Sequence, residues 1–324
     1  MIAISIMIEG QMGLTWARWK ALAAEVEALG FAGLFRSDHF TNAAPPDRES
    51  LEALTSLTYL ADRTERIHFG PLVAPVSFRD AVMLARQAAA IDDLSGGRFI
   101  LGLGAGWQDR EHGMYGYALG DMDTRFARLT EALELTTRLF GSDEPVTFEG
   151  RFYQLREARL LPRPLRPGGP TILIGGNGPR RTLPLVARYA QIWNAIGLTP
   201  EEFKERSALL DTLIEQQGRR PEDVRRTMMT GQIVAPDRDA LEQELRRRAP
   251  PDKADLPFDE LLALHQGRGW YRLIGTPEQI GAQLRACAAA GISELMLQWF
   301  ELDDLEALRA FAQMILPLAQ EGGV

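Results

Sequence analysis

The sequence has almost no cysteine, very little lysine and no long hydrophobic run. The single cysteine, Cys287, excludes an internal disulfide, and its alanine-rich surroundings are typical of a small buried helix residue. Lysine occurs only at Lys20, Lys204 and Lys253, all in polar, helical or loop-like contexts, which argues against a Schiff-base lysine. No apolar stretch approaches the roughly 18 residues that a membrane span needs, so we expect no membrane segment.

The chain has no excess of positive charge: 44 acidic residues outnumber 36 basic ones, which gives a net charge of -8. That balance argues against a nucleic-acid partner, which requires a dense basic face, and favours a small-molecule substrate as partner. The four histidines show no His-x-His or His-x-x-x-His spacing, so we predict no metal site. The amino-terminal segment 1–9 lacks a positive region and a cleavage site, so we interpret it as a first strand and expect a cytoplasmic protein.

Short β-rich runs alternate with longer stretches of helical period, a pattern typical of βα units in a parallel sheet. Between the first two runs, Thr15 can cap a helix whose apolar face includes Trp19, Leu22 and Val26 and which ends at Gly30. The number of runs is that of a closed barrel, so we predict an α/β fold of the (β/α)8 TIM-barrel type. The strands expected from the sequence are 2–8, 31–36, 67–73, 98–103, 171–174, 191–194, 228–234 and 292–298.

Two segments interrupt this alternation. Residues 141–170 end in a proline-rich run that cannot be helical, whereas residues 236–275 are charged and contain Pro250-Pro251. We expect both to be insertions at the C-terminal rim of one barrel domain that spans residues 1–324. No internal repeat or low-complexity tract indicates a second domain.

The reacting groups of such barrels gather at the carboxyl ends of the strands. Four successive predicted strands each have candidate residues at their carboxyl end or in the segment that follows, so we expect these residues to meet on the same rim. The residues concerned are Asp38 and His39 after the second strand, Leu72, Val73 and Ala74 after the third, Gly106 and Trp107 after the fourth, and Gly175, Gly176, Asn177 and Gly178 after the fifth.

Glycines occupy alternate positions in the run Leu101-Gly-Leu-Gly-Ala-Gly-Trp107. Their missing side chains leave space for a flat ligand close to the backbone, and the indole of Trp107 can cover that ligand. The run does not match a Rossmann fingerprint, because Trp107 stands at the third glycine position, so a dinucleotide in a doubly wound sheet is disfavoured.

The loop at residues 175–178 has the order strand, glycine loop and helix start, which offers free N–H groups to a phosphate. The alternative is a tight turn that needs positive φ. Arg180 and Arg181, at the start of the next helix, favour the phosphate, because arginine is locally unfavourable at a helix N-terminus without an anion.

His39 is the candidate catalytic residue, because a histidine can exchange protons near neutral pH or donate a hydrogen bond to a ring. Asp38 could tune its pKa if the two side chains were in contact, although adjacent residues on a strand point opposite ways. The alternative is a histidine satisfied in the barrel wall. His112 is a loop residue near the glycine run that could line the pocket, whereas His68 and His265 are expected to be structural or solvated.

Six motifs of this chain occur together in one known family. They are Asp38-His39, Leu72-Val-Ala-Pro-Val-Ser-Phe-Arg79, Leu94-Ser-Gly-Gly-Arg98, Gly102-Leu-Gly-Ala-Gly-Trp107, Glu111-His112 and Ile172-Leu-Ile-Gly-Gly-Asn-Gly178. With these motifs the chain resembles the bacterial luciferase-like superfamily, specifically its coenzyme F420-dependent oxidoreductases, and the likeness extends from residue 1 to the end.

The resemblance implies a barrel that binds the deazaflavin coenzyme F420, or alternatively FMN, at its carboxyl end, with the phosphate held by the loop at 175–178. By position, His39 is similar to the residue near the hydride-bearing edge of the ring. A non-prolyl cis peptide is implied near Leu72-Val73. Asn194 and Ala195 are similar to positions that border the cofactor tail, and a homodimer is implied as well.

One departure from the family narrows the function. The branch that oxidises glucose 6-phosphate has an acid directly after the glycine run, where this chain has Trp107, so sugar-phosphate dehydrogenation is disfavoured. The proton would then come from His39, from His112 or Tyr115, or from water. We expect hydride transfer between reduced F420 and a small organic substrate. The alternatives are a monooxygenase that uses reduced FMN and oxygen, a flavoprotein that only binds, and an unrelated barrel lyase.

Overall fold

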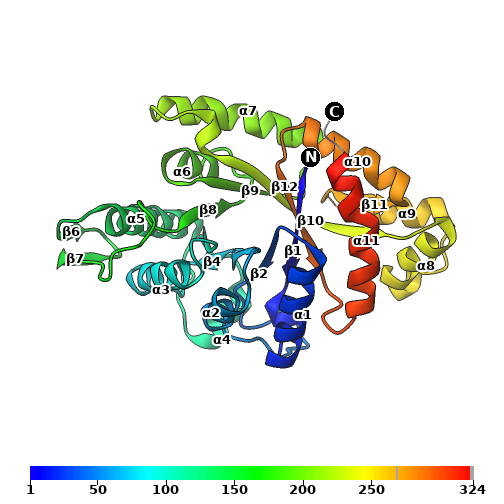
Figure 1. Cartoon of the computed structure of the whole chain (residues 1–324), viewed down its shortest axis with the longest axis horizontal. Coiled ribbons are helices and arrows are strands. Elements are labelled where there is room, and N and C mark those ends of the chain that lie inside the picture. Colours follow the sequence, from blue (N-terminus) through cyan, green and yellow to red (C-terminus); the bar gives the residue numbers. More distant parts are fainter. Residues whose placement is uncertain (268, 322–324) are drawn as a thin grey trace.

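The computed structural model describes residues 1–267 and 269–321, which form a parallel sheet rolled into a barrel with helices around it (Figure 1). Neighbouring strands follow the order β3-β2-β1-β12-β10-β9-β8-β5-β4, and all of these pairs are parallel. A parallel bridge between Phe69 of β3 and Phe99, the residue before β5, brings the two sides of the sheet together. The strands are β1 (Ala3–Ile8), β2 (Gly33–Arg36), β3 (His68–Pro71), β4 (Ala74–Pro75), β5 (Ile100–Gly104), β8 (Thr171–Gly175), β9 (Ile192–Ile196), β10 (Arg225–Val234), β11 (Arg272–Gly275) and β12 (Glu294–Trp299).

This arrangement confirms the predicted TIM-barrel fold. Each predicted strand has a counterpart, and the third is divided into β3 and β4 on either side of residues 72–73. One further strand, β11, was not predicted from the sequence, and it falls at the end of the second expected insertion. β11 is only four residues long, and it pairs with residues 231–234 of β10, beyond the part of β10 that pairs with β9 and β12.

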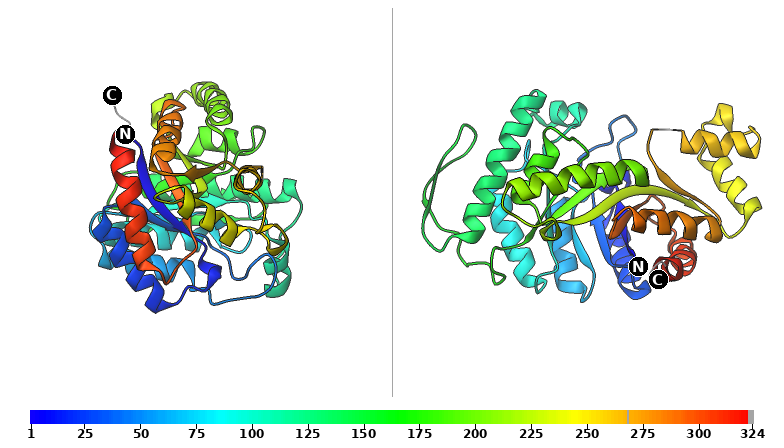
Figure 2. Two further views of the ribbon diagram at one scale, coloured as in Figure 1. Left: turned by 90° about the vertical axis from the view of Figure 1, so that its right-hand side faces the viewer. Right: turned by 90° about the horizontal axis from the view of Figure 1, so that it is seen from above.

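Helices follow the strands and cover the outside of the barrel (Figures 1 and 2). The first of them begins where Thr15 accepts a hydrogen bond from the N–H of Arg18, buries Trp19 and Leu22, and ends at Gly30 with φ of 88°. The helices are α1 (Trp16–Leu29), α2 (Ala53–Arg63), α3 (Ala81–Leu94), α4 (Asp109–Tyr115), α5 (Met122–Gly141), α6 (Thr182–Tyr189), α7 (Pro200–Gln216), α8 (Arg238–Arg248), α9 (Phe258–Gln266), α10 (Pro277–Ala289) and α11 (Leu305–Glu321).

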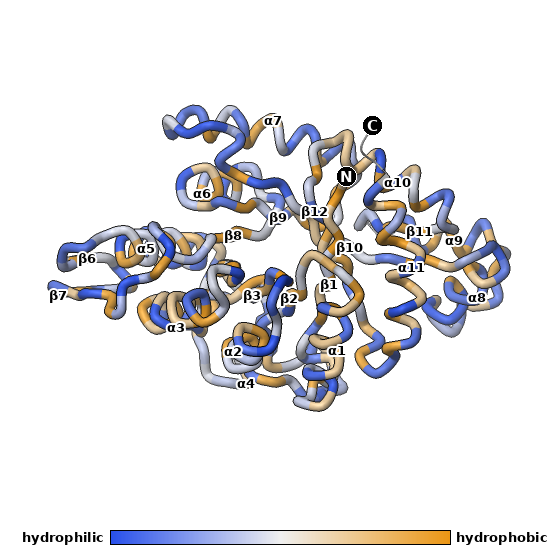
Figure 3. Tube along the Cα trace, viewed as in Figure 1, coloured by the Kyte–Doolittle hydropathy of each residue, from blue (hydrophilic) through white to orange (hydrophobic). Residues whose placement is uncertain are grey.

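Hydrophobic stretches concentrate in the central strands, and hydrophilic ones on the outer turns of helices such as α7 and α8 (Figure 3). The barrel interior is a packed core, so a ligand site can form only above it, at the strand ends. Its buried members are Met7, Phe35, Leu72, Ile100, Leu173, Ile192 and Met296. Within the described ranges, no helix has the length and apolarity needed to cross a bilayer.

The first expected insertion contains an antiparallel hairpin of β6 (Val146–Glu149) and β7 (Gln154–Ala158). Its turn is held against α5, because the carboxylate of Glu131 accepts hydrogen bonds from the N–H groups of Arg151 and Phe152 at 2.9 and 2.8 Å. The hairpin therefore lies along the side of the barrel at α5, and its turn lines a small hollow together with residues 76–80 after β4.

The second expected insertion contains α8, α9 and β11, on the opposite side of the barrel from the hairpin (Figures 1 and 2). These elements pack around an apolar cluster of their own, which includes Ile233, Leu241, Leu245, Leu261 and Ile274. Because β10 extends past its barrel neighbours to pair with β11, this insertion extends from the C-terminal rim.

Candidate active site

A cavity of about 580 Å³ opens at the carboxyl ends of the strands, a volume within the ordinary range for small-molecule sites. Its wall is built by residues that follow or end β1, β2, β4, β5, β8, β9 and β12, by the first turn of α5, and by Trp270 from the second insertion. Segments far apart in the chain therefore meet at one mouth.

Eight of the residues selected from the sequence line this cavity. They are His39, Leu72, Val73, Gly106, Trp107, Gly175, Gly176 and Asn194. The rim predicted from strand order is thus the rim that the structure forms, and Trp107 and the loop at 175–178 lie at the same end of the barrel. The other selected residues are placed off the cavity wall: Asp38, Ala74, His112, Asn177, Gly178 and Ala195.

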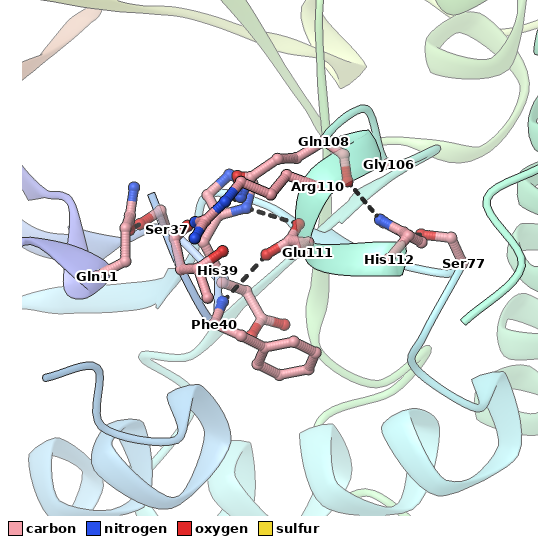
Figure 4. Close-up of polar contacts among 12 residues, drawn as sticks. Gln11, Ser37, His39, Phe40, Ser77, Gly106, Gln108, Arg110, Glu111 and His112 are labelled. Carbon is pink, nitrogen blue, oxygen red and sulfur yellow. Dashed lines mark hydrogen bonds and ion pairs between the residues drawn. The ribbon is translucent and has the colours of Figure 1, made fainter. Parts of the chain in front are cut away.

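His39 is held by a carboxylate that the sequence analysis did not select. Its Nδ1 lies 2.9 Å from Oε1 of Glu111, and Oε2 of Glu111 accepts the N–H of Phe40 at 3.0 Å (Figure 4). Burial lowers the pKa of the His39 imidazole. However, the hydrogen bond and the charge of Glu111, together with the charges of Glu9 and Asp38, outweigh this effect and raise the pKa above its ordinary value of 6.5.

Asp38 faces away from the cavity and forms a buried ion pair. Its two carboxylate oxygens accept hydrogen bonds from Nε and Nη2 of Arg79 at 2.8 and 2.7 Å, and Arg79 also contacts Glu52 at 2.6 Å. Because Asp38 and His39 point opposite ways, Asp38 acts on His39 only through its charge, which Arg79 offsets.

His112 is a buried structural link behind the cavity wall. Its Nδ1 lies 2.8 Å from the carbonyl oxygen of Gln108, and its Nε2 lies 2.7 Å from Oγ of Ser77 (Figure 4). With both ring nitrogens engaged and 2% of the residue exposed, His112 connects α4 to the loop after β4 and does not reach the cavity. Ala74 and Ala195 likewise belong to the buried apolar core, since they point outward from the barrel.

Close packing between neighbouring strands requires glycine at two positions of the glycine run. A Cβ on Gly102 would lie 2.1 Å from the carbonyl oxygen of Pro71, and one on Gly104 would lie 2.4 Å from Cγ2 of Val73. The bond between Leu72 and Val73 is a non-prolyl cis peptide, as the resemblance implies. Gly102 and Gly104 therefore allow the β3–β4 segment to approach β5. Gly104 and Gly106 also border the cavity, whereas Gly102 does not.

The loop at 175–178 is anchored to its neighbours by side chains. Gly176 has φ of 126°, so it needs glycine, and its carbonyl oxygen accepts the indole N–H of Trp193 at 2.8 Å. The amide of Asn177 donates to the carbonyl oxygen of Ile196 at 2.7 Å and accepts from the N–H of Ile196 at 2.9 Å. Asn177 thus fixes the loop to the end of β9 by its side chain and leaves its own backbone N–H free of protein acceptors in the described residues.

Several other side chains of the cavity wall were not predicted from the sequence, because no local pattern distinguishes them; Arg125 and Gln108 are two of them. Arg125, in the first turn of α5, lines the cavity, and Nη1 donates to the carbonyl oxygen of Gly106 at 3.1 Å. Gln108 lines it next to Glu111. The positive charge noted at the start of α6 is partly neutralised, because Arg181 forms an ion pair with Asp123.

Polar side chains that follow β1 or lie at the end of β12 form another part of the cavity wall. Glu9 accepts hydrogen bonds from Gln298 at 2.9 Å and from Gln11 at 3.0 Å, and Gln11 in turn accepts the hydroxyl of Ser37 at 2.7 Å. This network satisfies the Glu9 carboxylate with neutral donors. Among the described residues, no group of three or more His, Cys, Asp or Glu side chains could hold a metal ion.

Comparison with known proteins agrees with this architecture. The family model described as luciferase-like monooxygenase matches residues 3–294. The F420-dependent glucose-6-phosphate dehydrogenase of Amycolatopsis mediterranei is 27% identical over 316 residues, which cover 91% of this chain and 92% of that protein. The pyrimidine monooxygenase RutA of Escherichia coli is 27% identical over 295 residues, which cover 84% of this chain and 79% of that protein.

Solved structures show the same fold. An F420-dependent secondary alcohol dehydrogenase in complex with an F420-acetone adduct has a TM-score of 0.80 at 20% identity, and the match covers 98% of this chain and 99% of that chain. The family match spans most of the sequence, so this chain belongs to the luciferase-like monooxygenase family. The family predicted from the six motifs is therefore confirmed.

Proposed function

We propose that this chain is an oxidoreductase that transfers a hydride between reduced coenzyme F420 and a small organic substrate. The observation that carries the proposal is a shared cavity at the strand ends. It is lined by His39, Leu72, Val73, Trp107, Gly175 and Gly176. Support also comes from F420-dependent relatives that match almost the whole chain.

The polar atoms of the cavity fit a large ligand that carries both hydrogen-bonding groups and an anion. Arg125 Nε, Gln108 Oε1 and Trp270 Nε1 are buried there without a partner among the described residues, although buried polar atoms are normally hydrogen-bonded. A deazaflavin offers ring carbonyls, hydroxyls and a phosphate to such atoms. We propose that Arg125 holds the phosphate at the mouth of the cavity. The backbone N–H groups of residues 177–178 would assist it, since they directly follow the cavity-lining Gly175 and Gly176 and have no backbone acceptor among the described residues.

When bound in its reduced form, this cofactor supplies the hydride, so the chain itself has to orient the reactants and manage a proton. Leu72, Val73 and Gly175 give the cavity an apolar wall on the barrel side, against which a flat ring can lie. His39 lines the cavity and is the residue that we propose exchanges the proton, since its Nε2 has no hydrogen-bond partner in the described part of the chain.

Titration of the purified protein with F420 and with FMN, followed by fluorescence quenching, tests the proposal. We expect tighter binding of F420. The alternative function, a monooxygenase that uses reduced FMN and oxygen, is supported by relatives such as the pyrimidine monooxygenase. Tight binding of FMN alone would favour that alternative and overturn the first choice. Turnover lost in His39→Ala with binding retained distinguishes an enzyme from a protein that only binds.

The phosphate assignment has its own test. Arg125→Gln removes a charge-assisted hydrogen bond, which is worth about 1.5–3 kcal/mol, so the Kd for the cofactor should rise roughly 10- to 100-fold. Arg86→Gln on the exposed face of α3 is the matched control, and it should leave the Kd unchanged. Equal affinities for the two variants would show that the tail is held elsewhere.

Glucose 6-phosphate is a poor candidate substrate for this cavity. The cations on the described wall are Arg125 and His39, no lysine lines it, and Trp107 follows the glycine run. We further propose that residues 1–324 form one domain, that the protein is a homodimer and that it acts in the cytoplasm. Light scattering at micromolar concentration checks the oligomeric state. Turnover of glucose 6-phosphate as fast as that of small alcohols without a phosphate would contradict its exclusion as a substrate.

A further inference from the structure

We propose that Glu111 is a positioning residue that holds His39 as an imidazolium, with its Nε2–H presented to the substrate as the proton donor. This inference rests on the proposed function, because it assigns the proton that must accompany the hydride. It also narrows the substrate to a compound with a carbonyl or another polarised double bond.

The contacts of Glu111 determine which ring nitrogen of His39 is available to a ligand. Both oxygens of Glu111 are in use, one on Nδ1 of His39 and one on the N–H of Phe40, so the carboxylate is fixed between the loop after β2 and α4 (Figure 4). Nδ1 must carry a hydrogen to contact a carboxylate at 2.9 Å. Nε2 is then the ring nitrogen available to a molecule in the cavity.

Charge balance explains why the ring is held in its charged form. Glu111 is 1% exposed, and within the described residues His39 is its only ionic partner. A buried carboxylate without a counter-ion is costly, so Glu111 favours a positive charge on the imidazole. The neighbouring cation on α4, Arg110, is committed to Asp47 through two contacts of 2.6 Å.

Other charged groups near His39 act in the same direction or are compensated. Glu9, from the segment after β1, adds negative charge, although Gln11 and Gln298 donate hydrogen bonds to it. Asp38 is neutralised by Arg79. Trp107 lies edge-on to the His39 ring with centroids 5.5 Å apart and carries no charge.

The proton step balances for a carbonyl substrate. Addition of a hydride to the carbonyl carbon moves the C=O π pair onto oxygen, which then needs one proton. The Nε2–H bond of His39 breaks, its electron pair stays on the ring, and an O–H bond forms to give the alcohol. The neutral imidazole takes a proton from solvent before the next turnover, and the two electrons come from the reduced deazaflavin.

The test compares Glu111→Gln, Glu111→Asp and the control Asp109→Asn, an exposed carboxylate in the first turn of the same helix. A glutamine can still accept the N–H of Phe40, but it presents an NH₂ donor to Nδ1 and so favours the neutral ring. Imidazole NMR of the protein without cofactor reports the protonation of His39 directly. Cofactor affinity by fluorescence and the pH profile of kcat are measured in parallel.

We expect the His39 titration to move to lower pH in Glu111→Gln, with Nδ1 no longer protonated at neutral pH, whereas Asp109→Asn behaves as wild type. The kcat of Glu111→Gln should fall at least about tenfold at neutral pH and recover partly on acidification, with unchanged cofactor affinity. Glu111→Asp should retain part of the wild-type titration, because the charge is kept.

Two results would overturn the inference. One is a wild-type His39 that titrates at or below 6.5, which is measurable even if the variants do not fold. The other is a loss of kcat in Glu111→Gln that is the same at every pH with an unmoved His39 titration, which is the behaviour of a purely structural residue. Failure of F420 binding would refute the proposed function and leave the NMR result on the pair intact, so the two failures are distinguishable.

Discussion

Replacing Asp38 with asparagine tests whether this residue binds the cofactor or supports the barrel. Asp38 is 3% exposed and receives two charged hydrogen bonds from Arg79. An asparagine can accept only one of them, and its NH₂ group then faces the second guanidinium N–H. Breaking a buried pair costs about 3–5 kcal/mol, but Arg79 keeps Glu52 at 2.6 Å, so we expect a loss of about 3 kcal/mol in the free energy of unfolding.

The matched control is Asp47→Asn. Asp47 also accepts two hydrogen bonds from one arginine, here from Nη1 and Nη2 of Arg110 at 2.6 Å, but the two side chains are 40% and 25% exposed. Because surface pairs contribute about 0–1 kcal/mol, this variant should unfold close to the wild type in urea. Cofactor titration of both variants completes the assay. Refutation would be an Asp38→Asn protein that keeps wild-type stability but loses cofactor affinity, since Asp38 would then contact the ligand.

Three other predictions concern the cavity wall. Gly106→Ala should lower the free energy of unfolding by about 1–3 kcal/mol in thermal or urea unfolding, because φ is 80° and the new Cβ would lie 2.3 Å from Oγ of Ser77; a stable variant would show that the loop relaxes. Asn177→Ala removes two hydrogen bonds and should cost about 1–2 kcal/mol, with a weaker cofactor Kd in fluorescence titration; an unchanged Kd would mean that the loop keeps its shape unaided. Because the folded-state pKa of His39 is raised, the stability it adds relative to His39→Gln should be complete below pH 6.5 and decline as the pH rises through the folded value; a difference that grows with pH in urea unfolding would contradict the pairing with Glu111.

Local patterns were sufficient to predict the barrel and its rim. Strand and helix periods are set within ten or so residues, and parallel βα units place all strand ends on one side. The cavity residues from four loops followed from that rule alone. β11 was missed because its partner is the outer half of β10, and nothing in its own four residues indicates a partner outside the barrel.

The His39–Glu111 pair could not be predicted in the same way. The two residues are 72 positions apart, and they meet because the loops after β2 and β5 converge above the barrel. The motif that contains Glu111 could be recognised, but its contact depends on how α4 is oriented. The position of Arg125 on the cavity wall could not be predicted either, because an arginine in the first turn of an amphipathic helix is ordinarily solvated.

The glycines at 102 and 104 permit close packing between strands, and this packing also shapes the cavity. Gly102 and Gly104 admit Pro71 and Val73 at distances that any side chain would forbid. That close approach places Leu72 and Val73 on the cavity wall, against which we propose the ring lies. Gly102 therefore affects the cavity indirectly. A side chain there would clash with the backbone of Pro71 and displace the segment that carries Leu72 and Val73, although Gly102 itself does not line the cavity.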